Sequence, residues 1–250
     1  MSRLRNIKKL SILTVVDRNI NGLRRIYSEL NQIEFAEIEW VIKDSGRCKE
    51  TIEWARTLNN PGVLFVSSLD TGIYDALNQA LIISNGEYYV TLGSDDTIFV
   101  DGITNFLTEY NRFSNYDVIV YPVFVNCRLN LGRSLCPLFV STSGYISSHS
   151  VGTLIRRSVH ERLGMYDVNY KILADSLFIT RCIQNKLAFF YATEIAFGIF
   201  STQGISSTNH RARLVEAYRY QRSSGSSAFT QAILFLFRMI RYFPSIIFHE

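Results

Sequence analysis

Two adjacent carboxylates follow an apolar segment with the composition of a buried strand. Residues 87–92 read EYYVTL and residues 93–96 read GSDD, so Asp95 and Asp96 come directly after the expected strand. The carboxyl ends of strands in an open α/β sheet form the usual ligand crevice. Mg²⁺ takes one or two carboxylates together with substrate phosphates. Asp95 and Asp96 are therefore a candidate metal and phosphate site, and the alternative is a solvated turn that caps the next helix.

Two further acids occupy equivalent places. Asp44 follows an expected strand at 37–43, and Asp70 follows one at 62–67 after a short turn. A carboxylate at a sheet edge can accept hydrogen bonds from a base or ribose, or bind a cation that carries a diphosphate. Either acid alone could instead be a helix N-cap.

The elements that must position these acids alternate regularly through the first half of the chain. The expected strands lie near 10–16, 37–43, 62–67 and 87–92, and the expected helices near 20–32, 47–58 and 72–84. This alternation predicts an α/β fold with a mainly parallel central sheet and helices on both faces. Later segments are expected as a helix at 102–112, a strand at 117–125, a hairpin or loop at 129–150, an ordered segment at 151–156, a short helix, a helix from 174 and a strand at 188–192.

Composition narrows the class of protein. The chain has 250 residues, of which 47% are hydrophobic and 19% charged, so it can form a substantial core. The net charge of +4 does not suggest a nucleic-acid partner, although the clustered basic residues fit anionic lipid or phosphate. The four cysteines form no CxxC pair, which predicts free thiols in a reducing compartment and no structural zinc. The apolar stretch at 10–16 is too short for a signal peptide and is expected to be the first strand.

The end of the chain differs in composition from the rest. Residues 223–227 read SSGSS, a flexible linker, and separate an expected catalytic domain at 1–222 from an apolar segment at 228–250. A helix over 228–243 would be about 24 Å long, which is short of a membrane span. It is expected either to lie in the plane of a membrane surface or to pack on the domain or on a second subunit.

Two common nucleotide-binding classes are disfavoured. The turn after the first strand, residues 17–22, reads DRNING and lacks the GxGxxG of dinucleotide-binding proteins. The chain also has no GxxxxGK[ST] phosphate loop.

Several segments resemble the family 2 glycosyltransferases with a GT-A fold, especially bacterial polysaccharide enzymes similar to colanic acid transferases. Residues 70–78 read DTGIYDALN and are similar to the D-x-G-I-Y-D-A-M-N segment of that family. The spacing to residues 93–96 also follows the family, as do HSVGTLIRRS at 149–158 and GMYD at 164–167. The resemblance covers roughly residues 10 to 208.

The resemblance implies an inverting transfer of a sugar from a UDP- or GDP-sugar to a hydroxyl group. Asp44 would contact the nucleobase, while Asp70 and Asn78 would belong to the donor pocket. Asp95 and Asp96 would form the motif called DXD, with Mn²⁺ or Mg²⁺ as the cofactor. The chain departs from the pattern at Gly93, where many members have the first Asp.

The resemblance also assigns the remaining site residues. Asp175 takes the position of the general base, and an ordinary first-turn acid of a helix is the alternative. His149 would contact the acceptor or the diphosphate, and Arg211 would close over the diphosphate with a loop at 204–207, GISS. Both could equally be surface residues.

The function expected is extension of a lipid-linked saccharide in surface polysaccharide biosynthesis, at the cytoplasmic face of the inner membrane and with peripheral membrane contact. One alternative is a non-catalytic GT-A scaffold in polysaccharide assembly. A lesser one is a nucleotidyltransferase, which would consume a nucleoside triphosphate and release pyrophosphate.

Overall fold

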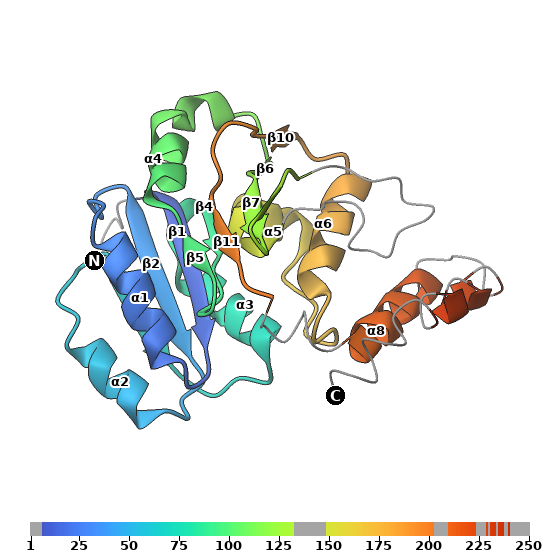
Figure 1. The fold of residues 1–250 in the computed structure, drawn as a ribbon, viewed down its shortest axis with the longest axis horizontal. Coiled ribbons are helices and arrows are strands. Elements are labelled where there is room, and N and C mark those ends of the chain that lie inside the picture. Colours follow the sequence, from blue (N-terminus) through green and yellow to red (C-terminus); the bar gives the residue numbers. More distant parts are fainter. Residues whose placement is uncertain are drawn as a thin grey trace.

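A seven-stranded sheet forms the centre of the molecule in the computed structural model (Figure 1). The structure describes residues 7–132, 149–202 and 210–223, together with 229, 231–233, 235–237 and 240. The strand order is β10-β6-β9-β4-β1-β2-β3. β9 is antiparallel to both of its neighbours, and the other pairs are parallel, which confirms the mainly parallel sheet. The strands are β1 (Lys8–Val16), β2 (Ile38–Asp44), β3 (Val63–Ser67), β4 (Gly86–Thr91), β6 (Val118–Val120), β9 (Thr153–Arg156) and β10 (Phe189–Tyr191).

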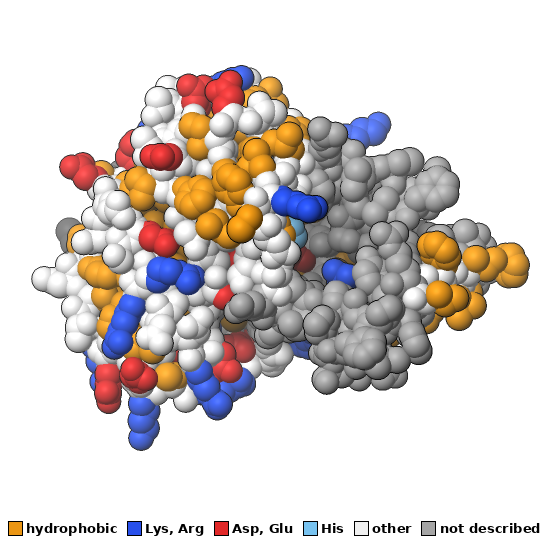
Figure 2. All heavy atoms as spheres, in the orientation of Figure 1, with side chains coloured by type: hydrophobic (Ala, Val, Ile, Leu, Met, Phe, Trp, Pro, Cys, Tyr) orange, Lys and Arg blue, Asp and Glu red, His pale blue; other side chains and the backbone are white. Residues whose placement is uncertain are grey.

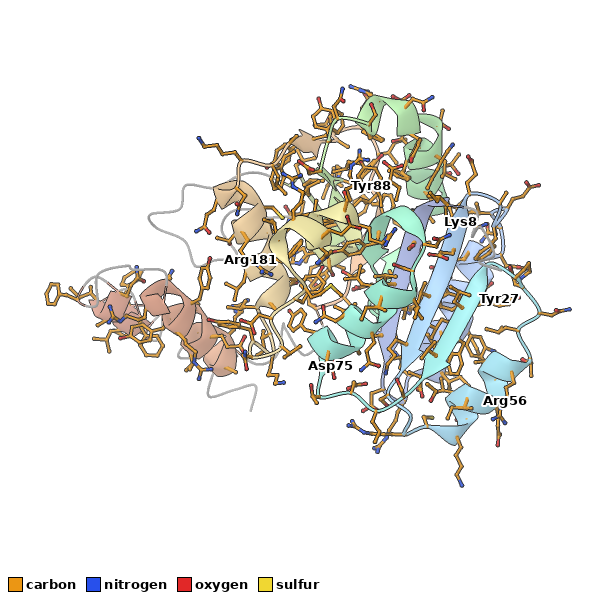
Figure 3. The ribbon with its side chains drawn as sticks, turned by 180° about the vertical axis from the view of Figure 1, so that it is seen from behind. Lys8, Tyr27, Arg56, Asp75, Tyr88 and Arg181 are labelled. Carbon is orange, nitrogen blue, oxygen red and sulfur yellow. The ribbon has the colours of Figure 1, made fainter. Side chains whose placement is uncertain are left out.

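Helices cover both faces of this sheet, as the alternating pattern predicts. α1 (Ile20–Leu30) and α4 (Val100–Thr108) pack on one face, with α2 (Lys49–Arg56) at its border. α3 (Ile73–Ile83), α5 (Ser158–Leu163) and α6 (Ala174–Gln184) pack on the other, where Figure 3 labels Asp75 near the start of α3 and Arg181 on α6. Because both faces are covered, β2 is buried along its whole length.

A smaller sheet corrects one prediction. The single strand expected at 117–125 is wrong: β6 belongs to the large sheet, whereas β7 (Val123–Val125) belongs to a second sheet of order β5-β11-β7-β8. The chain changes sheets at Pro122, which has no N–H for a ladder, and the N–H of Tyr121 donates to the carbonyl of Gly152. The other strands of this sheet are β5 (Thr97–Ile98), β8 (Arg128–Asn130) and β11 (Gly198–Phe200).

Other boundaries differ by a few residues. The helix expected at 102–112 is α4 followed by a 3₁₀ turn at Tyr110–Phe113. Within the loop expected at 129–150, residues 133–148 lie outside the described residues. A second 3₁₀ turn, Ser150–Gly152, then leads into β9.

Helix α8 (His210–Ser223) lies against the start of α6. Ala217 packs with Ile172, Leu173 and Leu177. Beyond it, the described residues of the tail are helical, and the rings of Tyr218 and Phe235 lie 5.4 Å apart. Of the predicted linker at 223–227, Ser223 is the last residue of α8 and residues 224–227 lie outside the described residues. Among the described helices, none combines the length and hydrophobicity of a membrane-spanning segment.

Candidate active site

The predicted acids meet at one edge of the large sheet because the first four strands run parallel. Val16 pairs with Asp44, and Asp44 pairs with Ser67, so β1, β2 and β3 end side by side. β4 ends next to β1, which places the loop at 92–96 at the same edge. β9 runs in the opposite direction, and its beginning, preceded by His149, therefore also reaches this edge.

Asp44 uses only one of its two carboxylate oxygens within the described part of the chain. The side chain is fully buried. Its Oδ2 accepts hydrogen bonds from the N–H of Gly46 and the hydroxyl of Ser67, each at 2.8 Å. Oδ1 is buried and has no hydrogen-bond partner among the described residues. A buried carboxylate oxygen without a donor is costly, so Oδ1 is suited to accept a hydrogen bond from a ligand.

Lys43 is a site residue that the sequence reasoning missed. Its ammonium is completely buried and donates to the carbonyls of Asp44 and Ser68, at 2.7 and 2.6 Å. It also pairs with Asp70 Oδ2 at 3.3 Å, while Asp70 Oδ1 accepts the N–H of Gly72. Lys43 thus fixes the turn between β3 and α3. The available signal was a lysine near the end of a strand that is expected to be buried, because a buried charge requires partners.

In the acidic loop, Asp96 is tied to the main chain through both oxygens. It is 4% exposed, and its Oδ2 accepts the N–H of Gly93 at 3.0 Å. Its Oδ1 accepts the N–H of Ser201 at 2.7 Å. Burial raises the pKa of Asp96 to about 7, and the neighbouring charge of Asp95 adds to the rise. Asp95 is half-buried, and its carboxylate makes no hydrogen bond to the described residues.

Residues at the start of α1 hold the acidic loop at 93–96 in place. Asn19 caps the helix by accepting the N–H of Gly22, and it donates to the hydroxyl of Ser94 at 3.0 Å. Arg25 donates to the carbonyl of Asp96 at 2.7 Å. A Cβ added at Gly22 would lie 1.9 Å from the Ser94 carbonyl oxygen, so a larger residue would displace the loop. These supporting residues were not predicted from the sequence.

Gly93 has a steric role of its own. A Cβ at this position would lie 2.7 Å from Asp95 Oδ1 and 2.8 Å from Asp96 Oδ2. The glycine therefore leaves the space that both carboxylates occupy. This is the position at which the chain departs from the family pattern.

Asp175 lies in the first turn of α6 and is held through one oxygen. Oδ1 accepts the N–H of Ser176 at 2.7 Å and lies 2.9 Å from the hydroxyl of Tyr74, a residue of α3. Oδ2 makes no hydrogen bond to the described residues. Burial raises the pKa of Asp175 above its usual value. A carboxylate with a raised pKa and one available oxygen can act as a general base.

Asn78 has a structural contact that the sequence did not reveal. Its Oδ1 accepts the N–H of Tyr166 at 3.1 Å, and its Nδ2 donates to the carbonyl of Tyr166 at 2.9 Å. Both ends of the amide are thereby bonded to the segment before α6. The geometry gives Asn78 a supporting contact, and its predicted contact with the donor remains a prediction.

The remaining two candidates are His149 and Arg211. The His149 ring stacks on Phe200, with centroids 3.9 Å apart, and Phe200 precedes the Ser201 that bonds to Asp96. Burial lowers the pKa of His149 to about 4, so it is neutral at neutral pH. Arg211 is in α8, and its side chain, like the loop at 204–207, lies outside the described residues.

The donors available for a metal are two carboxylates. Within the described part of the chain, no group of three His, Cys, Asp or Glu side chains is placed to hold an ion. These two carboxylates fit a cation such as Mg²⁺, which completes its coordination shell with water and substrate phosphates. They do not fit a cation whose ligands all come from the protein.

Comparison with known sequences identifies distant relatives. No protein-family model matches the chain. The PGL/p-HBAD biosynthesis glycosyltransferases of Mycobacterium bovis (strain BCG / Pasteur 1173P2) and Mycobacterium tuberculosis (strain ATCC 25177 / H37Ra) are each 24% identical to it over 165 residues. The match covers 60% of this chain and 59% of each relative.

Solved structures extend the likeness over nearly the whole chain. S. aureus TarS 1–349 superposes with a TM-score of 0.66 at 15% identity, covering 94% of this chain and 72% of that one. The mannosyltransferase PcManGT from Pyrobaculum calidifontis, in complex with GDP-Man and Mn²⁺, gives 0.63 at 16% identity, with 94% and 70% coverage. With the parallel sheet and its acidic edge, these likenesses identify the fold of the chain as GT-A, the fold of these glycosyltransferases.

Proposed function

We propose that this protein is an inverting glycosyltransferase that moves a sugar from a UDP- or GDP-sugar to a hydroxyl group. The observation that carries the proposal is the buried, unpartnered Asp44 Oδ1 at the same sheet edge as Asp95 and Asp96. The relatives are named glycosyltransferases, TarS has been solved with UDP, and PcManGT with GDP-Man, which supports a nucleotide-sugar donor.

The donor would lie along this edge with its base at β2. Asp44 Oδ1 would accept the ring N–H that uracil and guanine both carry. Asp95, with its unengaged carboxylate, would be the direct ligand of a Mn²⁺ or Mg²⁺ ion, and Asp96 would fix the loop behind it. When bound, such an ion offsets the negative charge that develops on the leaving diphosphate.

Asp175 would serve as the general base. Its Oδ2 takes the proton of the acceptor hydroxyl while that oxygen forms its bond to the anomeric carbon. The bond between this carbon and the diphosphate oxygen breaks, and its electron pair leaves with the nucleoside diphosphate. Attack from the face opposite the leaving group inverts the anomeric configuration.

The acceptor would be a lipid-linked saccharide of surface polysaccharide or glycolipid biosynthesis, reached at the cytoplasmic face of the inner membrane. The tail supports this because its apolar side chains point into solvent and gather at the outer end of the molecule in Figure 2. These residues are Phe229, Ile233, Leu236, Phe237 and Ile240. An exposed apolar helix face of this kind suits a membrane surface.

Flotation with anionic vesicles tests the membrane contact. The triple change Phe229→Ser, Leu236→Ser and Phe237→Ser is expected to abolish co-flotation. Ile82→Ser, at an equally exposed apolar residue of α3, is the control and is expected to float like the unchanged chain. Equal flotation of the triple variant would contradict the role of the tail.

The donor is identified by a thermal-shift panel of nucleoside diphosphates and nucleotide sugars with and without Mn²⁺, followed by product analysis. One nucleotide is expected to raise the melting temperature with Mn²⁺ present, since a ligand at 100 times its Kd stabilises the native state by about 2.7 kcal/mol. Asp95→Asn should remove the part of this rise in melting temperature that depends on Mn²⁺. Binding without transfer would favour the non-catalytic scaffold, and pyrophosphate release from a triphosphate would favour a nucleotidyltransferase.

A further inference from the structure

The hydroxyl of Tyr74 lies between two acceptor oxygens. Tyr74 is in the first turn of α3 and is buried. Its hydroxyl oxygen is 2.7 Å from the carbonyl oxygen of Ile172 and 2.9 Å from Asp175 Oδ1. The carbonyl can only accept, and a phenol has a single proton to donate. Tyr74 can therefore donate a full hydrogen bond to only one of these oxygens at a time.

The charge of Asp175 decides which acceptor receives the hydrogen bond from Tyr74. An ionised carboxylate is the stronger acceptor, because hydrogen bonds to a charged group are roughly twice as strong as neutral ones. Once Asp175 is protonated, the carbonyl of Ile172 becomes the competing acceptor. The O–H bond can turn from one to the other without movement of heavier atoms, since a hydroxyl hydrogen rotates to suit its surroundings.

The packing around Tyr74 keeps both contacts in place. Its ring lies against Tyr166, with centroids 5.8 Å apart, and the Tyr166 hydroxyl is 2.7 Å from that of Tyr89. On the other side, Glu216 of α8 accepts the N–H of Ile172 at 3.0 Å. The tyrosine and the carbonyl are thus fixed by separate elements.

The other ionisable groups at this corner have partners of their own. Burial raises the pKa of Tyr74, Tyr89 and Tyr166 and lowers that of His160 to about 4, so all four are neutral at neutral pH. The charged side chains on the surrounding elements bond elsewhere and not to Asp175 within the described residues; they are Asp75, Lys171, Arg181 and Glu216.

We propose that Tyr74 is a positioning residue for the general base: it binds Asp175 Oδ1 while the carboxylate is charged and so turns Oδ2 toward the acceptor. When Oδ2 takes the acceptor proton, Tyr74 keeps its own proton and turns its O–H to hydrogen-bond the carbonyl of Ile172 instead. The role of Tyr74 in sugar transfer rests on the proposed function. The link between Tyr74 and the ionisation of Asp175 stands independently of any donor.

Tyr74→Phe tests this role because it keeps the ring and removes only the hydroxyl. Without that donor the ionised carboxylate is less stable, so the pKa of Asp175 is expected to rise. The acid limb of the kcat/KM profile should then move to higher pH, with a loss of about tenfold at pH 7 and an unchanged donor KM. Tyr121→Phe is the control, since the Tyr121 hydroxyl bonds to Asn105 in the opposite core and its removal should leave the limb in place.

A second readout needs no turnover. The ¹³C carboxyl signals of the aspartates are titrated by NMR in the full chain, and Asp175→Asn assigns the signal. A rise of the Asp175 pKa in Tyr74→Phe supports the proposal. An unchanged pKa, with activity lowered equally at every pH, would show a merely structural tyrosine. If the unchanged protein transfers no sugar from any donor, the proposed function fails, and the titration still decides whether Tyr74 controls Asp175.

Discussion

Asp96 is buried and Asp175 is half-buried, and the chain holds the two acids differently. Both oxygens of Asp96 accept main-chain N–H groups, one from Gly93 in the same loop and one from Ser201, which is remote in sequence. Asp175 is held through Oδ1 alone, by Ser176 and Tyr74. A carboxylate bonded at both oxygens fixes the backbone around it, whereas one bonded at a single oxygen keeps the other for a reactant. The number of engaged oxygens therefore fits Asp96 for a supporting role and Asp175 for the proposed role of general base.

The largest expected effect is that of Asp175→Asn. The amide oxygen can still accept from Tyr74 and Ser176, so the fold and the donor site should persist while the base is lost. We expect transfer to fall by about 10²- to 10⁴-fold with the nucleotide-induced thermal shift unchanged. Asp167→Asn, at an exposed acid that bonds to Asn169 before the same helix, is the matched control. If Asp175→Asn transfers sugar within a few fold of the unchanged chain, Asp175 is not the general base.

The adjacent acids of the loop should respond differently to the same change. In Asp96→Asn the new NH₂ group faces one of the two main-chain N–H donors, so we expect a loss of about 1–3 kcal/mol in the free energy of unfolding. Asp95→Asn should leave this free energy nearly unchanged and remove the Mn²⁺-dependent thermal shift. Urea denaturation and thermal shift measure the two quantities. Equal destabilisation by both variants would contradict the assignment of Asp96 as the supporting acid and Asp95 as the metal ligand.

The smallest effect is a pH dependence of stability. The pKa of Asp96 is raised from 3.8 to about 7 by burial, so the folded protein binds this proton more tightly than the unfolded chain. Its contribution to the free energy of unfolding is full below about pH 4 and is lost as the pH rises through 7. The raised pKa values of Asp175 and Glu29 act in the same direction.

Denaturation at a series of pH values measures this dependence. The free energy of unfolding should fall between pH 4 and 7, and the slope should be smaller in Asp96→Asn. A slope identical to that of the unchanged chain would mean that Asp96 ionises normally. Mn²⁺ should bind more tightly as the pH rises over the same range, because ionised Asp96 adds a negative charge beside the Asp95 ligand.

The sequence predicted the positions of the candidate acids better than the residues that hold them in place. Asp44, Asp70 and Asp95 were placed at one edge because parallel strands must end together, an arrangement that strand order alone imposes. Lys43, Arg25 and the hydroxyl contact of Tyr74 were missed because they depend on how close segments remote in sequence come in space.

The second half of the chain was predicted less well than the first. Short strands there pass between two sheets, so the regular alternation that guided the first half no longer applies. The error at 117–125 arose because an apolar run does not reveal that its two ends join different sheets.

The carboxylate of Glu216 has a consequence for the order of synthesis. It accepts the N–H groups of Lys171, Ile172 and Leu173, the residues that lead into Asp175. A ribosome delivers residues 8–96, which contain Asp44, Asp70 and the acidic loop, long before it delivers α8. The segment that leads into Asp175 should therefore reach its final conformation only after α8 has been synthesised, so Asp175 should be the last of the predicted site acids to be fixed in place.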